Sequence, residues 1–121
     1  MKLSEIGAML QAEVVVAGTE DIEIATAFGV DLMSDALAYA KPGCLLITGL
    51  ITPQTIRTAY ALDIAAIMVV RGKIPPPDAI KVAEELEIPL LRTSYIMFEA
   101  CGRLYQAGMV GCIEAVNRCE R

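Results

Sequence analysis

The residues best suited to chemistry in this chain lie in the stretch VVRGKIPPP, residues 69–77. Arg71 and Lys73 flank a glycine directly after an aliphatic run, and a cationic loop at the end of a strand can bind an anion such as phosphate. The three prolines that follow fix φ and remove backbone N–H groups, which suits the first turn of a helix but deprives an anion of donors. Neither nucleotide-binding glycine motif, G-x-x-x-x-G-K-[ST] or G-x-G-x-x-G, is present. The stretch is therefore a stiff corner or an anion site, and the prolines favour the corner.

Polar residues follow three expected strands, which end near residues 50, 71 and 94. In an open parallel sheet, ligands bind in the crevice beyond the carboxyl ends of the strands, so these residues should gather at one edge. Their types suit a polar or anionic ligand. The candidate ligand-binding set is Thr48, Gly49, Thr52, Arg71, Gly72, Lys73, Thr93 and Ser94. The competing interpretation is that Thr52, Thr93 and Ser94 only cap helices.

Asp31 and Asp35 lie one helical turn apart, a spacing that could serve a divalent metal ion or acid–base chemistry. No third ligand accompanies them, so Asp31 is better interpreted as a helix cap and Asp35 as a favourable charge in the first turn. An enzyme would use one of these carboxylates as base and Arg71 as an electrostatic clamp. The chain has no His, the usual general base near neutral pH, and we expect no catalytic residue, no metal and no cofactor.

The composition of the chain limits the kinds of partner that we expect for it. The 121 residues are 55% hydrophobic, which fits one domain, and the net charge of −5 argues against a nucleic-acid partner. The apolar runs are all shorter than the roughly 20 residues that a membrane helix needs, and the N-terminus lacks the pattern of a signal peptide, so we expect a cytoplasmic protein. The cysteines form no close pair of the kind that binds zinc, and we expect four buried or half-buried thiols: Cys44, Cys101, Cys112 and Cys119.

Hydrophobic periodicity and turn signals divide the first half of the chain into short elements. A glycine closes the second element and the sequence KPG closes the fourth. We expect a helix at residues 3–11 with Ser4 as its cap, strands at 13–18 and 22–28, a helix at 31–40 and a strand at 44–50.

The second half of the chain repeats itself. LLITGLITP, residues 45–53, aligns with MVVRGKIPP, residues 68–76, and each is followed by a helical pattern. Two such units side by side predict parallel strands joined by helical crossovers. A third strand at 88–94 and an amphipathic helix after it follow, and residues 111–121 weakly suggest an accessory C-terminal helix. The predicted fold class is α/β, with a mostly parallel sheet and helical crossovers in a single compact domain.

The order of the motifs ITGL, VVRGKIPPP and EELEIPLLRTSYIMFEACGRL resembles the DRTGG domain family, over roughly residues 1–110. That family is similar to the N-terminal domain of HPr kinase/phosphorylase. The resemblance implies an α/β fold, a tendency to form homodimers, and a regulatory role without catalysis. It also suggests a partner among anaerobic redox proteins, such as a hydrogenase-type complex.

The chain departs from the pattern that gives the family its name. Gly49-Leu50-Ile51 stands where the family has Gly-Asp-Arg, and Val70-Arg71-Gly72 stands where it has Thr-Gly-Gly. Ligand contacts made through that Asp and Arg cannot be transferred to this chain. The sequence thus predicts a homodimeric, non-catalytic regulatory or interaction module acting on a partner protein. The alternative is a sensor that binds a nucleotide or another anionic metabolite at the strand-end loops.

Overall fold

The computed structural model of this protein describes residues 1–116. Over those residues the chain forms five helices and a six-stranded sheet. The elements in chain order are α1 (Leu3–Met9), β1 (Glu13–Val16), β2 (Thr26–Gly29), α2 (Met33–Tyr39), β3 (Leu45–Thr48), α3 (Pro53–Ala61), β4 (Ala66–Val69), α4 (Pro77–Glu85), β5 (Leu90–Arg92), α5 (Met97–Gln106) and β6 (Val110–Gly111).

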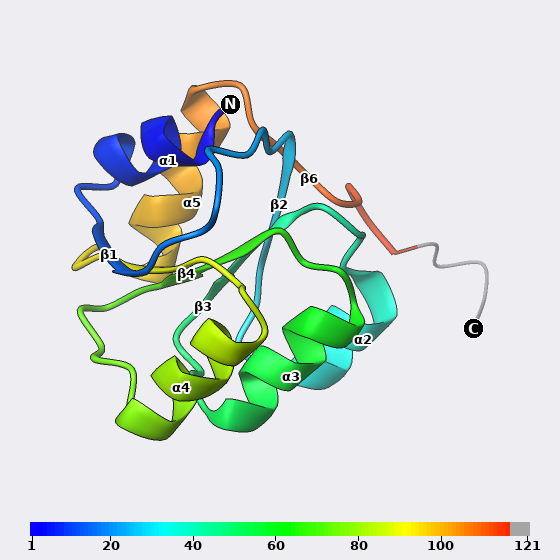
Figure 1. The fold of residues 1–121 in the computed structure, drawn as a ribbon. Helices are drawn as coiled ribbons and strands as arrows, with labels where there is room; N and C mark the ends of the chain where they lie inside the picture. The colour runs from blue at the N-terminus through cyan, green and yellow to red at the C-terminus, as the bar shows by residue number, and fades with distance from the viewer. Residues whose placement is uncertain (117–121) are drawn as a thin grey trace.

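The sheet has the strand order β1-β5-β4-β3-β2-β6. Every neighbouring pair is parallel except β1 with β5, which is antiparallel and contains an irregularity between Val14 and Val16. Helices α2, α3 and α4 lie on one side of the sheet, and α1 and α5 lie together on the other (Figure 1). The α/β fold with a mostly parallel sheet is thus confirmed.

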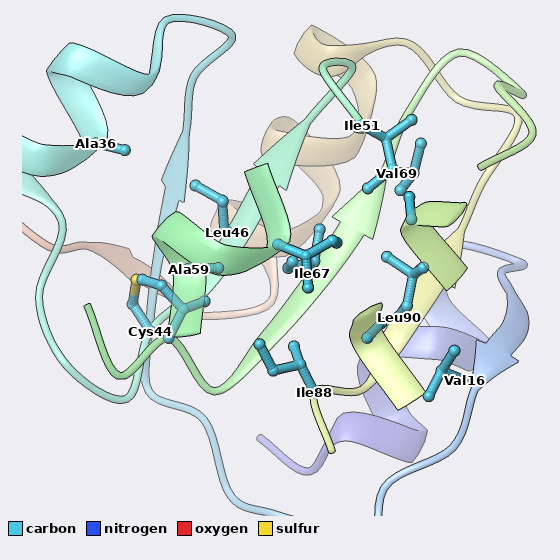
Figure 2. Packing of buried hydrophobic residues seen from close by; sticks show 14 residues of the cluster. Val16, Ala36, Cys44, Leu46, Ile51, Ala59, Ile67, Val69, Ile88 and Leu90 are labelled. Carbon is cyan, nitrogen blue, oxygen red and sulfur yellow. The ribbon is translucent and has the colours of Figure 1, made fainter. Parts of the chain in front are cut away.

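The central strands β3 and β4 are buried along their whole length. Alternate residues of each strand face opposite layers of helices, so both faces must be apolar, and this explains the uninterrupted aliphatic runs in the sequence. On one face Leu46, Ile67 and Leu90 pack beneath α3 and α4 (Figure 2). On the other face Leu45 and Met68 pack with residues of α1 and α5.

The internal repeat corresponds to two strand–loop–helix units, β3–α3 and β4–α4. Their strands pair in register from Leu45 with Ala66 to Thr48 with Val69. Each helix begins at a proline, Pro53 or Pro77, where the missing N–H costs no intrahelical hydrogen bond. Equivalent loops of the two units therefore lie next to each other at one edge of the sheet.

Two predictions about the N-terminal half were wrong in detail. Ser4 does not cap α1, because the helix starts at Leu3; the N–H and hydroxyl of Ser4 instead donate to the carboxylate of Asp21, at 2.9 and 2.5 Å. The strand expected at residues 22–28 is only the short β2, which begins at Thr26. Before it, Glu23 forms an isolated bridge with Lys2, so the period-two pattern there reflects docking against α1 and not a longer strand.

The C-terminal segment also differs from the expectation. Val110–Gly111 forms β6 beside β2, and residues 112–116 contain no helix. The remainder of the helix suggested for 111–121 falls on residues 117–121, outside the described part of the chain. No helix within residues 1–116 has the length and apolar character needed to cross a membrane.

Candidate functional site

The loop after β3 is ordered by a carboxylate from the segment after β2. The Oδ1 atom of Asp31 accepts a hydrogen bond from the Gly49 N–H at 2.7 Å and one from the Thr48 hydroxyl at 3.3 Å. The same hydroxyl oxygen accepts from the Leu50 N–H at 3.0 Å. Asp31 was interpreted as a helix cap from the sequence, and this was wrong: α2 starts at Met33 and its cap position is Leu32. Asp35 does lie in the first turn of α2, as predicted.

Thr52 has the capping role that the competing interpretation gave it. It occupies the N-cap of α3, and its Oγ1 accepts from the Thr55 N–H at 3.2 Å and contacts the Thr55 hydroxyl at 3.1 Å. This arrangement satisfies a backbone donor that the first turn of any helix leaves unpaired. The Thr52 side chain is nevertheless exposed, so it can still face solvent beside the loop.

The guanidinium group of Arg71 lies over Gly49. A Cβ atom added to Gly49 would come within 2.5 Å of Nη2 and 3.0 Å of Nε of Arg71. Glycine at this position therefore leaves the space that the guanidinium occupies. The two units of the repeat meet here, because Gly49 belongs to the first loop and Arg71 to the second.

The loop after β4 is anchored through its backbone to the segment after β5. The Arg71 N–H donates to the Tyr95 carbonyl at 2.8 Å, and the Gly72 N–H donates to the Thr93 carbonyl at 2.9 Å. Arg71 and Gly72 both adopt left-handed backbone conformations, with φ of 64° and 65°. Because these two N–H groups are already bonded, an anion at this loop cannot be bound by them, and the side chains of Arg71 and Lys73 are its available donors. The stiff corner is therefore a correct description of the backbone.

Sequence reasoning missed Arg92, the last residue of β5. Its guanidinium donates to the carbonyls of Gly72, at 3.0 Å, and Lys73, at 3.2 Å, and forms an ion pair with Glu13 of β1 at 3.1 Å. It thereby fixes the loop that carries Arg71 and Lys73. The signal available in the sequence was a lone cation inside the otherwise aliphatic stretch IPLLRTS, with an acidic residue at the start of the strand expected at 13–18.

Thr93 and Ser94, expected to cap a helix or to contact a ligand, behave differently from each other. Thr93 is buried; its hydroxyl donates to the Leu10 carbonyl at 2.6 Å and accepts from the Tyr95 N–H at 3.2 Å. It therefore joins β5 to the end of α1 and does not face the edge. Ser94 is exposed beside Gly72, and a Cβ added to that glycine would lie 3.9 Å from the Ser94 hydroxyl. The N-cap of α5 is Ile96, without a side-chain cap bond, so neither residue caps this helix.

The eight candidate residues therefore gather at one sheet edge, but with unequal access to solvent. Thr48 and Thr93 are buried and use their hydroxyls internally. Within residues 1–116, neither Arg71 nor Lys73 takes part in an ion pair, and both are exposed. Thr52 and Ser94 are the exposed hydroxyl residues of the set. The edge thus offers two cationic side chains and two hydroxyl groups around a rigid backbone.

The ionisable groups of the described residues include no metal site and one strongly shifted thiol. No group of three or more His, Cys, Asp or Glu side chains within residues 1–116 is placed to hold a metal ion. Cys44 is buried, and Cys101 and Cys112 are half-buried, as predicted; Cys119 lies outside the described residues. Burial, and then the neighbouring Cys112 thiol, raises the pKa of Cys44 to about 12. Such a thiol remains protonated near neutral pH and is a poor nucleophile.

Comparison with known families identifies the domain. The family model described as the DRTGG domain matches residues 5–107. The chain belongs to the DRTGG domain family. A search of curated proteins finds no match.

Among solved structures, this DRTGG domain is similar to the crystal structure of the CBS and DRTGG domains of the regulatory region of Clostridium perfringens pyrophosphatase, complexed with the activator diadenosine tetraphosphate. The TM-score is 0.72 at 17% sequence identity. The alignment covers 96% of this chain and 51% of that chain, so this chain spans about half the length of its structural neighbour. At this level of identity, the likeness establishes the fold.

Proposed function

We propose that this DRTGG domain is a non-catalytic regulatory module that binds an anionic small molecule, of which nucleotides are the first class to test, and communicates its presence to a protein partner. The observation that carries the proposal is the rigid loop with Arg71 and Lys73 at the carboxyl edge of the sheet. In a chain with a net charge of −5, two exposed cations without carboxylate partners among the described residues form a local positive site.

The anchoring of the loop also supports this function. Arg92 and the carbonyls of Thr93 and Tyr95 hold the loop backbone, so binding through Arg71 and Lys73 would not need to order the chain first. Preorganisation of this kind lowers the entropic cost of binding. The neighbouring structure from Clostridium perfringens gives the ligand class to begin with, since that regulatory region is complexed with a dinucleoside polyphosphate activator.

The test is a thermal-unfolding screen with diadenosine tetraphosphate, ATP, AMP and inorganic pyrophosphate. A ligand at about 100 times its dissociation constant should stabilise the fold by about 2.7 kcal/mol, which raises the melting temperature measurably. Arg71→Ala and Lys73→Ala should reduce the shift. Lys41→Ala is the matched control, because Lys41 is an exposed cation just before β3, at the opposite edge of the sheet. If none of the probes stabilises the protein, or if Arg71→Ala responds as the unchanged chain does, the proposed site is wrong.

A second candidate function is an interaction module that works as a homodimer without a ligand. The observation that favours it is the exposed apolar side of α5, where Phe98 is 83% and Tyr105 is 73% exposed. A partner of the hydrogenase type, a cytoplasmic location and the absence of a nucleic-acid partner all stay predictions. Size-exclusion chromatography with light scattering tests the oligomeric state, and a strictly monomeric protein at high concentration would remove the support for this candidate.

A further inference from the structure

Helix α5 has one side fixed against the sheet and another that the described residues leave uncovered. On the inner side, Ala100 and Leu104 are buried, and the helix packs so closely on Gly29 that a Cβ there would lie 2.9 Å from the Cys101 sulfur. On the outer side, Phe98 and Tyr105 are both largely exposed. An exposed apolar surface of this kind commonly marks an interaction site.

The outer side of α5 contains both a projection and a depression. Phe98 and Tyr105 lie two helical turns apart, and Gly102, between them, has no side chain to fill the space. A Cβ added to Gly102 would meet no heavy atom of the described residues within 4 Å. A hollow of about 560 Å³ is lined by these three residues together with Glu99, Cys101, Arg103 and Gln106, all of them on α5.

We propose that this face of α5 binds the same face of a second copy of the chain, with the two helices antiparallel about a two-fold axis that passes near Gly102. A two-fold interface must be complementary to itself, and a helix that carries aromatic side chains on either side of a glycine hollow meets that condition. Phe98 of one copy packs beside Tyr105 of the other, over the crossing point at Gly102. Aromatic residues in this position supply most of the contact energy of an interface.

The positions of the charged residues on this face of α5 are consistent with the same two-fold axis. Glu99 and Arg103 form an ion pair at 2.8 Å along the helix, and both line the hollow. The midpoint between Phe98 and Tyr105 falls between Cys101 and Gly102, and the midpoint between Glu99 and Arg103 falls at Cys101. The two midpoints differ by half a residue, roughly 0.8 Å along a helix. One antiparallel arrangement therefore brings the aromatic pairs together and also places each Glu99 near Arg103 of the other copy.

This inference deepens the second candidate function, since it locates the surface of the homodimer. It does not depend on the anion site, which lies in the loops after β3, β4 and β5. Its test uses no ligand. A failure of the dimer and a failure of ligand binding are therefore observed separately.

The first experiment is sedimentation equilibrium of the full chain and of Phe98→Asp. Loss of a central aromatic contact, with a charge brought into an apolar interface, should raise the dimer dissociation constant by about thirtyfold or more. The matched control is Leu37→Asp, because Leu37 is an exposed leucine of α2, on the other side of the sheet. A monomeric native chain, or an equal effect of the two substitutions, would overturn the proposal. Circular dichroism should show that both variants fold.

A second experiment tests the antiparallel arrangement with charge reversals. The Glu99→Arg chain and the Arg103→Glu chain should each dimerise more weakly, because like charges meet across the axis. Mixed in equal amounts, the two chains should form a heterodimer, since each cation then faces a carboxylate in the other copy. The Glu99–Arg103 pair within one helix remains broken in both chains, so its restoration cannot explain the rescue. A mixture that associates no better than either chain alone would exclude this orientation.

Discussion

The two units of the internal repeat use different means to order the same kind of loop. In β3–α3, the side-chain hydrogen bonds that order the loop are mostly local: Thr48 binds the Leu50 N–H and Thr52 caps the helix, while Asp31 binds the Gly49 N–H from farther along the chain. In β4–α4, the helix cap position is Pro76, which has no side-chain hydrogen bond, and the loop is fixed by Arg92.

This difference explains why only the second loop is suited to present cations. In the first loop the Thr48 hydroxyl is directed inward, to Asp31 and the Leu50 N–H. In the second loop Arg92 binds the carbonyls of Gly72 and Lys73 and leaves the Arg71 and Lys73 side chains exposed. Arg71 and Lys73 are exposed, while Thr48 is buried. The repeat supplies the same scaffold twice, and in the second copy the anchored loop carries exposed cations.

The largest expected effect comes from removal of the long-range anchor. Arg92→Met should lower the free energy of unfolding by about 1.5–3 kcal/mol, because it removes the charged donor that binds two loop carbonyls. Chemical denaturation measures the change. The control is Glu13→Gln, which removes only the exposed ion pair with Arg92 and should cost under about 1 kcal/mol. Equal losses in the two variants would mean that the carbonyl contacts contribute nothing.

The free energy of unfolding should depend on pH through Cys44, which lies at the start of the first unit and has no ionisable counterpart at the start of the second. The pKa of the Cys44 thiol is raised from 9.0 to about 12. Ala65, at the start of the second unit, donates its N–H to the Cys44 carbonyl and has no side chain that titrates. The unfolded chain loses the thiol proton of Cys44 near pH 9 and the folded chain keeps it. The contribution of the protonated Cys44 thiol to the free energy of unfolding is therefore present below pH 9 and is lost as the pH rises towards 12. About 1 kcal/mol should be lost by pH 10.

The measurement is chemical denaturation at pH 8 and pH 10, for the native chain and for Cys44→Ala. The variant will be less stable overall because it loses buried volume, so the informative quantity is the change between the two pH values. That change should be smaller in the variant by about 1 kcal/mol. Identical changes would show that Cys44 titrates in the folded protein as it does in the unfolded chain.

Loss of the local cap should have a smaller effect than loss of Arg92. Thr52→Ala should cost about 1 kcal/mol, because the Thr55 N–H at the start of α3 loses its acceptor. Thr58→Ala, in the interior of the same helix, is the matched control and should be neutral or slightly stabilising. Thermal or chemical unfolding measures both. If the two substitutions had the same effect, the cap would not account for the order of the first loop.

The smallest expected effect is at the contact between the two loops. Gly49→Ala should cost less than about 1 kcal/mol, because the guanidinium of Arg71 is the end of a flexible side chain and can move away. In an Arg71→Ala background this cost should vanish. Gly72→Ala should instead cost about 1 kcal/mol in either background, since its φ of 65° disfavours a side chain whatever its neighbours. A cost at Gly49 that is independent of Arg71 would contradict the contact.

Much of the fold could be predicted from the sequence because its signals are local. Aliphatic runs of four to five residues, glycine loops and prolines at helix starts are set by short-range sterics and by burial on both faces, so the repeat and the parallel sheet followed from them. The expected position of the candidate residues at one edge followed from topology alone. The short β2 was misjudged because an alternating pattern can arise from docking against a helix as well as from a strand.

The roles of polar side chains whose partners are distant in the sequence could not be predicted. Asp31, Thr93 and Arg92 each bind groups that are distant in the sequence, and no local pattern encodes such partners. The sequence by itself determined the order of the elements from α1 to α5, the apolar core and the cations at residues 71 and 73. Only the tertiary structure decided which N–H groups are already bonded, which hydroxyls are buried and that Arg71 rests on Gly49. The physical reason is that burial patterns depend on local periodicity, whereas each polar contact depends on where the whole chain brings its partner.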